Sequence, residues 1–160
     1  MTIAGIDEVA EAEIALQLLA CCGSGNWVRQ MLAERPFQSQ DRLESAASEI
    51  WWRLSHADWL EAFSKHPKIG EKGKVSEWSA QEQSGMNSAA AQVAGQLADL
   101  NRVYFEKFGW IFIVCATGKT AAEMLSLLQA RLPNAADDEI RIAAAEQNKI
   151  TLLRLRKLLA

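Results

Sequence analysis

Apolar residues recur every three or four positions through most of this chain, which is the spacing of a helix with one buried face. The longest such stretch starts near Ser79 and ends at Gly109. Its apolar face carries Met86, Ala90, Val93, Leu97, Leu100, Tyr104 and Phe108. The pattern predicts one long amphipathic helix, followed by a glycine of the kind that commonly ends helices.

Shorter stretches of the same kind predict six further helices, at about 9–22, 26–34, from 40 onwards, 58–65, 120–132 and from 136 onwards. Ser55 and the pair Thr120-x-x-Glu123 can cap two of these helices by hydrogen bonding to the first turn. No repeat, low-complexity segment or linker divides the chain. We therefore expect an all-α fold, in which residues 1–160 form a single-domain multi-helix bundle.

One segment does not fit the helical pattern. The residues WIFIVCAT, from Trp110 to Thr117, are rich in β-branched and aromatic side chains and lie between two glycines. A lone buried strand would leave main-chain N–H and C=O groups without partners. The segment is therefore either helical after all, or something else uses those groups, for which a bound polar ligand is one candidate.

Charge and composition narrow the choice of partners. Seventeen Lys and Arg against twenty Asp and Glu give a net charge of −3. With no basic block in the sequence, we expect neither nucleic acid nor a membrane surface as a partner. No apolar run suits a membrane span, and neither the acidic start nor the terminal LLA resembles a targeting signal. The three cysteines form no disulfide or zinc pattern, so we expect no metal, and buried reduced thiols in a cytoplasmic protein.

The first candidate for chemistry is His66, in the stretch HPKIG. Pro67 disfavours helix at the residue before it, so we expect His66 at the end of the helix over 58–65 or just past it. A histidine held there can present its imidazole to a cleft and transfer protons near neutral pH. Alternatively, local carbonyl groups satisfy the ring. His56, at a helix start, is a weaker candidate.

The start of the long helix supplies a second group of candidates. Ser79, Glu82 and Gln83 lie around its first turn, where free N–H groups and the helix dipole attract anions. A carboxylate-bearing substrate could bind there. The alternative is a capping box, in which the Glu82 side chain returns to the N–H of Ser79.

The third candidate is Arg154, in the last helix. At 100° per residue it falls within about 40° of Ile140, Ile150 and Leu158, so we expect it on the apolar face. An arginine that points inwards needs an anionic partner, such as Glu82, another carboxylate or a substrate. The alternative is a side chain that extends along apolar surface to reach water.

Together these stretches resemble one family. HPKIG, WSAQEQSGM, LNRVYFEKFGWIFIVCATGKT and the terminal KITLLRL are similar to segments of the 2-oxo-4-hydroxy-4-carboxy-5-ureidoimidazoline (OHCU) decarboxylases, as are RPF, IWWRL and DWLEAF. The resemblance covers nearly the whole chain. The short, lysine-rich loop EKGKV at 71–75 departs from it, without removing a candidate group.

The resemblance implies an all-α enzyme of urate breakdown that decarboxylates a small ureide to (S)-allantoin without a cofactor, and that works as a homodimer. Trp51 or Trp52 would be candidate dimer contacts if exposed. The resemblance also implies catalytic roles for His66 and Glu82. The substrate-binding residues that it implies are Pro67, Ser79, Gln83, Phe112, Ile113, Val114, Cys115, Ala116 and Arg154, with 112–116 acting through main-chain groups.

Two other functions stay open. The chain could be a ureide-binding or interaction domain without turnover, which would bind a ureide but not accelerate allantoin formation. It could instead hydrolyse a cyclic ureide, with His66 and Glu82 activating water, and release a ring-opened product but no CO2. No pair of a base and a nucleophile in the sequence favours this hydrolase.

Overall fold

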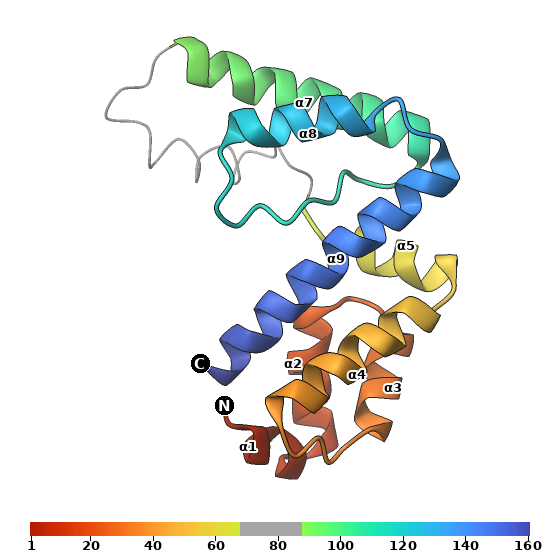
Figure 1. Cartoon of the computed structure of the whole chain (residues 1–160), viewed down its shortest axis with the longest axis vertical. Coiled ribbons are helices and arrows are strands. Elements are labelled where there is room, and N and C mark those ends of the chain that lie inside the picture. Colours follow the sequence, from red (N-terminus) through yellow and green to blue (C-terminus); the bar gives the residue numbers. More distant parts are fainter. Residues whose placement is uncertain (68–87) are drawn as a thin grey trace. The chain divides into compact units, whose positions relative to one another are not determined.

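The computed structural model describes residues 1–67 and 88–160, and eight helices lie within them (Figure 1). These described residues contain no strand, so the predicted all-α fold is confirmed. The chain divides into two compact units. The first unit comprises Met1–Lys65 and Ala144–Ala160, and the second unit comprises His66–Ala143.

The first unit contains five whole helices and the C-terminal part of α9 (Ala136–Leu159). The five are α1 (Ile3–Glu8), α2 (Glu11–Cys21), α3 (Gly25–Ala33), α4 (Gln40–Arg53) and α5 (His56–Ser64). The last three each begin directly after a serine whose hydroxyl accepts a hydrogen bond from a first-turn N–H; these serines are Ser24, Ser39 and Ser55. Because a helix leaves its first N–H groups without internal partners, these serines favour the observed starts.

Three tryptophans occupy the core of the first unit. Trp27, Trp51 and Trp59 are buried, and each indole N–H donates to a main-chain carbonyl. The acceptors are Ala47 at 3.1 Å, Ala144 at 2.8 Å and the Trp51 carbonyl at 2.9 Å, respectively. A buried indole needs such an acceptor, because an unpaired N–H away from water is costly. The bond to Ala144 links α4 to α9 within this unit.

The second unit is built around α7 (Ser88–Phe108), α8 (Ala121–Arg131) and the beginning of α9. Helices α7 and α8 lie side by side, and the segment that connects them joins their shared core (Figure 1). The buried members of this core are Leu97, Tyr104, Phe108, Phe112, Val114, Met124, Leu125 and Leu128. Helix α8 starts at the predicted capping box of Thr120 and Glu123.

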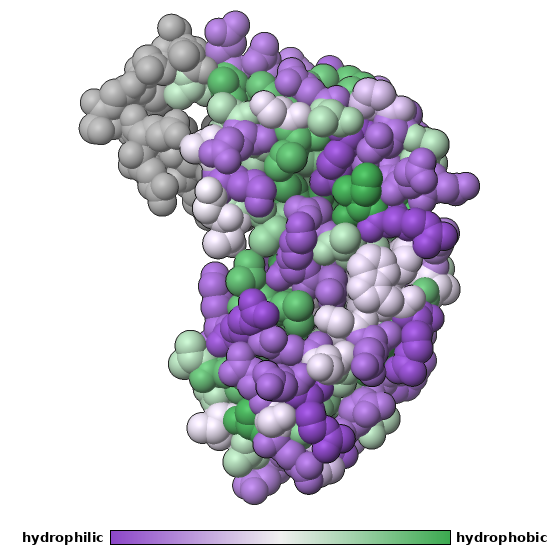
Figure 2. Space-filling model, viewed as in Figure 1, coloured by the Kyte–Doolittle hydropathy of each residue, from purple (hydrophilic) through white to green (hydrophobic). Residues whose placement is uncertain are grey.

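Hydrophilic residues cover much of the surface seen in Figure 2, with smaller hydrophobic areas between them. Two neighbouring tryptophans of α4 differ sharply, since Trp51 is 1% exposed and Trp52 is 45% exposed. Among the helices that the structure describes, none is long and apolar enough to cross a membrane.

The helices lie close to where the sequence predicts them, with one addition. The short helix α1 was missed because six residues are too few for a periodic pattern; it is capped by Thr2, which accepts from the Gly5 N–H. The predicted long helix ends at Phe108 as expected, and its start near Ser79 lies outside the described residues. The single domain over residues 1–160 stays a prediction.

Candidate functional site

His66 lies just beyond the end of α5. The helix ends at Ser64, Lys65 is its C-cap, and His66 and Pro67 follow outside the helix. This confirms the predicted position, which Pro67 favours because it disfavours helical backbone at the preceding residue. His66 is half-buried and Pro67 is exposed. A half-buried imidazole can reach a ligand while its surroundings limit its rotation, which suits proton transfer.

The other histidine has a clear structural role. His56 is the first residue of α5, and its ring stacks on the buried Trp59 with the ring centroids 5.1 Å apart. His56 is therefore a packed surface residue, which makes it a matched control for His66.

The segment 111–116 connects α7 to α8 without forming a helix or a strand. Gly109 and Gly118 flank it with φ angles of 88° and 76°, which side chains with a Cβ rarely adopt. Five of its residues are at most 8% exposed: Ile111, Phe112, Ile113, Val114 and Cys115. The helical alternative for this segment is therefore excluded, and the question becomes where its main-chain polar groups find partners.

Three carbonyl groups of this segment accept hydrogen bonds within the second unit. Arg131 Nη1 donates to the Ile113 carbonyl at 2.7 Å. Lys119 donates to two others, from Nζ to the Cys115 carbonyl at 2.8 Å and from its main-chain N–H to the Ala116 carbonyl at 3.0 Å. Two cationic side chains thus satisfy buried acceptors that a sheet or a helix would otherwise satisfy.

Most N–H groups of the segment, and the carbonyls of Phe112 and Val114, have no partner among the described residues. No described residue accepts a hydrogen bond from the main-chain N–H of the buried residues Phe112, Ile113 and Val114, or from that of the exposed Ala116. Buried main-chain N–H groups almost always have a partner. This row of donors is therefore suited to bind the carbonyl or carboxylate oxygens of a polar ligand.

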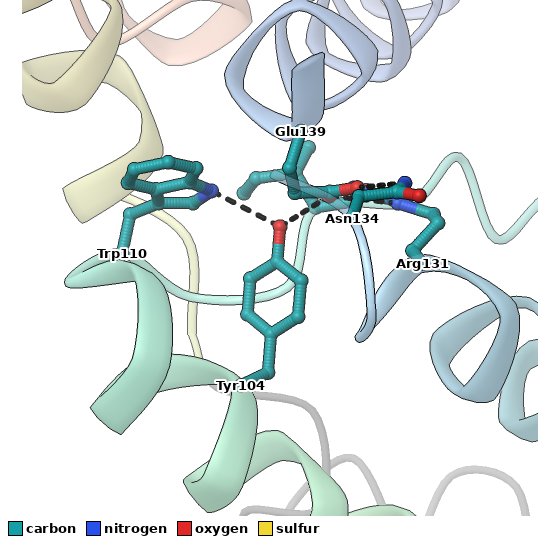
Figure 3. A network of polar contacts seen from close by, with 6 residues as sticks. Tyr104, Trp110, Arg131, Asn134 and Glu139 are labelled. Atoms are coloured by element: carbon teal, nitrogen blue, oxygen red, sulfur yellow. Dashed lines mark hydrogen bonds and ion pairs between the residues drawn. The ribbon is translucent and has the colours of Figure 1, made fainter. Parts of the chain in front are cut away.

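Arg131, which donates to the Ile113 carbonyl, also forms a buried ion pair with Glu139 (Figure 3). Glu139 of α9 is fully buried, and one of its oxygens, Oε2, accepts from Arg131 Nε at 2.9 Å and from Arg131 Nη2 at 2.6 Å. The Tyr104 hydroxyl donates to the same oxygen at 2.5 Å, and Asn134 Nδ2 donates to Oε1 at 3.1 Å. Trp110 Nε1 in turn donates to the Tyr104 hydroxyl at 3.1 Å.

This network keeps the guanidinium in one orientation. Burial, and then the hydrogen bond to Glu139, raise the pKa of Tyr104 well above its usual range, so its hydroxyl stays a donor. The Arg131 guanidinium also lies 4.4 Å from the centroid of the Phe112 ring. Arg131 is not among the residues predicted from the sequence, although it shares a face of α8 with Met124 and Leu128. The helical phase that was applied to Arg154 would have found it.

Arg154 lies in the first unit and is exposed, so the prediction that it points inwards is wrong. Gln147, Thr151 and Leu155 form the buried face of α9 there. The Arg154 side chain instead extends to the Ala20 carbonyl, to which Nη1 donates at 3.2 Å. Carbonyls in the last turn of a helix lack helical partners and attract cations, which explains this contact.

Two cysteines lie near Arg154. Burial raises the pKa of Cys21 to about 11 and that of Cys22 to about 12, while the positive charge of Arg154 opposes both shifts. Neither of these cysteines nor Cys115 forms a disulfide, and all three are buried, which confirms the predicted buried thiols. The raised pKa values keep Cys21 and Cys22 protonated at neutral pH, so these two thiols are poor nucleophiles there.

The remaining candidates, Ser79, Glu82 and Gln83, lie outside the described residues. Of the described candidates, His66, Pro67 and the segment 112–116 belong to the second unit, and Arg154 belongs to the first unit. In the part of the chain that the structure describes, no group of three or more His, Cys, Asp or Glu side chains could hold a metal ion.

Comparison with known proteins gives consistent matches. The model of the OHCU decarboxylase family matches residues 7–156. A crystal structure of OHCU decarboxylase in the presence of (S)-allantoin superimposes with a TM-score of 0.77 at 38% identity, covering 89% of this chain and 96% of that one. The 2-oxo-4-hydroxy-4-carboxy-5-ureidoimidazoline decarboxylase of Amia calva is 30% identical over 131 residues, which are 78% of this chain and 75% of that protein.

A longer relative also matches. The uric acid degradation bifunctional protein TTL of Arabidopsis thaliana is 43% identical over 146 residues, which are 86% of this chain and 45% of that protein. The chain thus spans less than half the length of the bifunctional uric acid degradation proteins that it matches.

Proposed function

The chain belongs to the OHCU decarboxylase family, and on that basis we propose that it converts 2-oxo-4-hydroxy-4-carboxy-5-ureidoimidazoline (OHCU) into (S)-allantoin and CO2 in urate breakdown. The observation that carries the proposal is the segment 112–116, in which Phe112, Ile113, Val114 and Cys115 are buried. The main-chain N–H groups of Phe112, Ile113 and Val114 have no acceptor among the described residues, and a ureide offers several carbonyl oxygens to such donors. Oriented donors in a buried setting bind polar groups without first being reorganised.

The proposed reaction removes CO2 and adds one proton. Loss of CO2 leaves an electron pair on the ring carbon that carried the carboxylate. The adjacent C=N of the imidazoline ring accepts this pair and its nitrogen takes up a proton, which gives an enol. The enol hydroxyl then loses its proton and becomes the new carbonyl of allantoin, while the ring carbon that bears the ureido group gains a proton. Because the ring itself is the electron sink, we propose that no cofactor takes part. Delivery of the proton to one face of the ring gives a single enantiomer.

Proton handling is assigned to His66, with Glu82 as a second catalytic residue. A half-buried imidazole just beyond α5 can interact with the substrate hydroxyl as CO2 leaves and can support protonation of one face. Glu82, together with Gln83, would fix the hydroxyl and ureido groups. Acid–base help of this kind contributes about 10²–10⁴-fold to a rate.

The carboxylate and the ureido group of the substrate need different partners. Arg154 and the helix start that the sequence predicts near Ser79 would bind anionic or carbonyl groups, because both would present positive charge. The ureido carbonyl would accept hydrogen bonds from the N–H groups of 112–116. Pro67 would contact the substrate through its main-chain carbonyl.

The protein is further proposed to act as a homodimer in the cytoplasm. None of the three cysteines, all of which the structure describes, forms a disulfide, which suits a reducing compartment. Trp52 is a candidate dimer contact because a large exposed aromatic side chain is typical of interfaces, whereas Trp51 is buried and unsuited to this role. Light scattering on the purified chain measures the mass directly, and the mass of one chain would contradict the dimer.

The proposed reaction is tested with OHCU that carries ¹³C in its carboxylate. We expect release of ¹³CO2 to accelerate in proportion to the amount of protein added. A hydrolase would instead leave the label in a ring-opened product, and a binding domain would bind the ureide without changing the rate of release. Either outcome would contradict the proposed reaction.

A further inference from the structure

Arg131 connects the proposed ureide-binding segment to the interior of the second unit. We propose that Arg131, held by Glu139, is a positioning residue: by fixing the Ile113 carbonyl, it directs the Val114 N–H towards the ureido group of the substrate. This inference rests on the proposed function, because it names the residue that orients one proposed substrate contact, the Val114 N–H.

The geometry of the peptide bond carries the first step. The only cis peptide bond in the described residues is Arg35-Pro36, so the bond between Ile113 and Val114 is trans. In a trans peptide the C=O and the following N–H point in opposite directions. The Ile113 carbonyl accepts from Arg131 Nη1 at 2.7 Å. The Val114 N–H must therefore point away from Arg131, to the side where no described residue accepts its hydrogen bond.

The second step is the rigidity of Arg131. Its Nε and Nη2 both donate to Glu139 Oε2, and its Nη1 donates to Ile113, so all three guanidinium nitrogens are engaged. Its carboxylate partner is itself held by Tyr104 and Asn134. Arg131 is only 7% exposed. A planar guanidinium that is hydrogen-bonded at each nitrogen cannot rotate. The direction of the Val114 N–H, which Arg131 orients through the Ile113 carbonyl, is therefore fixed before substrate binds.

Lys119 provides a comparison on the same segment. Its Nζ holds the Cys115 carbonyl at 2.8 Å, which by the same argument directs the Ala116 N–H away from Lys119. Lys119 carries a single ammonium on a flexible stem and is half-buried, whereas Arg131 is locked by Glu139. The structure thus favours Arg131 as the more rigid of the two positioning groups.

A test on the unaltered protein uses ¹⁵N-valine labelling, with the Val114 resonance identified through Val114→Ile. Titration with (S)-allantoin, which keeps the ureido group, should shift the Val114 amide resonance and slow its hydrogen exchange. Saturation with (S)-allantoin that leaves the Val114 amide unchanged would overturn the inference, even if the protein decarboxylates OHCU.

Variants separate positioning from stability. Arg131→Lys keeps the buried charge beside Glu139 but cannot serve both acceptors as a fork. The double variant Arg131→Met with Glu139→Gln removes both charges while leaving an acceptor for Tyr104. We expect each to raise KM for OHCU by about five- to tenfold, the equivalent of one oriented hydrogen bond, with kcat nearly unchanged. A purely structural role would lower the melting temperature and the active fraction without changing KM.

The matched control is Lys107→Met, which removes a cation that donates to the Leu132 carbonyl at 2.6 Å and the Asn134 carbonyl at 3.1 Å, away from the segment. We expect its KM to stay at the wild-type value. A wild-type KM in folded Arg131→Lys would contradict the positioning role. Absence of turnover in the wild-type protein would instead contradict the proposed function. The titration with (S)-allantoin would then still test whether the Val114 N–H binds the ureido group.

Discussion

Arg131 and Glu139 form a buried ion pair in which two guanidinium nitrogens donate to a single carboxylate oxygen, at 2.9 Å and 2.6 Å. The Arg131 side chain is 9% exposed and that of Glu139 is fully buried. The pair joins α8 to α9 and also holds the connecting segment through the Ile113 carbonyl. Stability and the proposed binding of substrate therefore depend on the same two side chains.

Glu139→Ala should be among the most destabilising substitutions in the second unit. It would leave the Arg131 guanidinium buried without its anionic partner, which typically costs about 3–5 kcal/mol of unfolding free energy. Urea denaturation followed by circular dichroism measures this loss. Lys149→Gln is the control, because Lys149 is 64% exposed in its pair with Glu146 and such surface pairs contribute little. A loss for Glu139→Ala as small as that of the control would contradict the importance of the pair.

His66→Asn should lower kcat by about 10²–10⁴-fold while leaving the fold intact, because it removes the proposed proton-handling group without removing a core side chain. His56→Asn is the matched control, since His56 stacks on Trp59 at the start of α5. We expect that control to keep its activity. Steady-state kinetics on both variants, with circular dichroism spectra for folding, measure the effect. Full activity in folded His66→Asn would contradict the assignment.

Arg154→Gln should discriminate between substrate and product. OHCU carries a carboxylate and (S)-allantoin does not, so loss of the cation should raise KM for OHCU by about 10–100-fold and leave allantoin affinity unchanged. Calorimetry with allantoin and steady-state kinetics with OHCU measure the two quantities. Arg156→Gln is the control, because Arg156 is engaged with Glu44 at 2.8 Å. Equal losses of both affinities in Arg154→Gln would contradict a carboxylate-binding role.

The thiols of Cys21 and Cys22 should resist alkylation in the folded protein. Burial raises their pKa values to about 11 and about 12, so both are almost wholly protonated at pH 8. Iodoacetamide treatment followed by peptide mass mapping should show little labelling at either site in buffer and full labelling in urea. Rapid labelling in buffer would contradict the burial of these two thiols at the C-terminal end of α2.

The same shifts give a pH dependence of stability. Since the folded pKa values lie above the ordinary value of 9.0, the thiols contribute stability that is fully present below pH 9. This contribution is lost as the pH rises from 9 through 11 to 12, because unfolding then releases protons. The urea concentration at the midpoint of unfolding should fall between pH 8 and pH 10.5. We expect this fall to be smaller in Cys21→Ala than in the wild-type protein.

The helix positions could be predicted because local signals specify them. Ser39, Ser55 and Thr120 cap the helices that follow them, and Gly109 ends α7. The segment 111–116 could not be assigned, because its conformation depends on Arg131, a partner 18 positions from Ile113. Such tertiary hydrogen bonds leave no periodic trace in the sequence.

The candidate site was predicted unevenly for a related physical reason. The place of His66 follows from the local effect of Pro67 and was confirmed. Helical phase predicts the face of the last helix on which Arg154 lies, but it does not predict where the long side chain ends. That side chain extends to the Ala20 carbonyl instead of the core. Glu139 was missed because a carboxylate in an acidic first turn is usually solvated, and only the approach of Arg131 makes its burial favourable.

The most direct test of the central claim follows optical activity. OHCU is generated in place from urate with urate oxidase and hydroxyisourate hydrolase, and the circular dichroism of allantoin is recorded with and without the purified chain. We expect rapid appearance of the (S)-allantoin signal, at a rate that scales with protein concentration. Only the slow, racemic background, with no net signal at any protein concentration, would contradict the assignment of this chain as an OHCU decarboxylase.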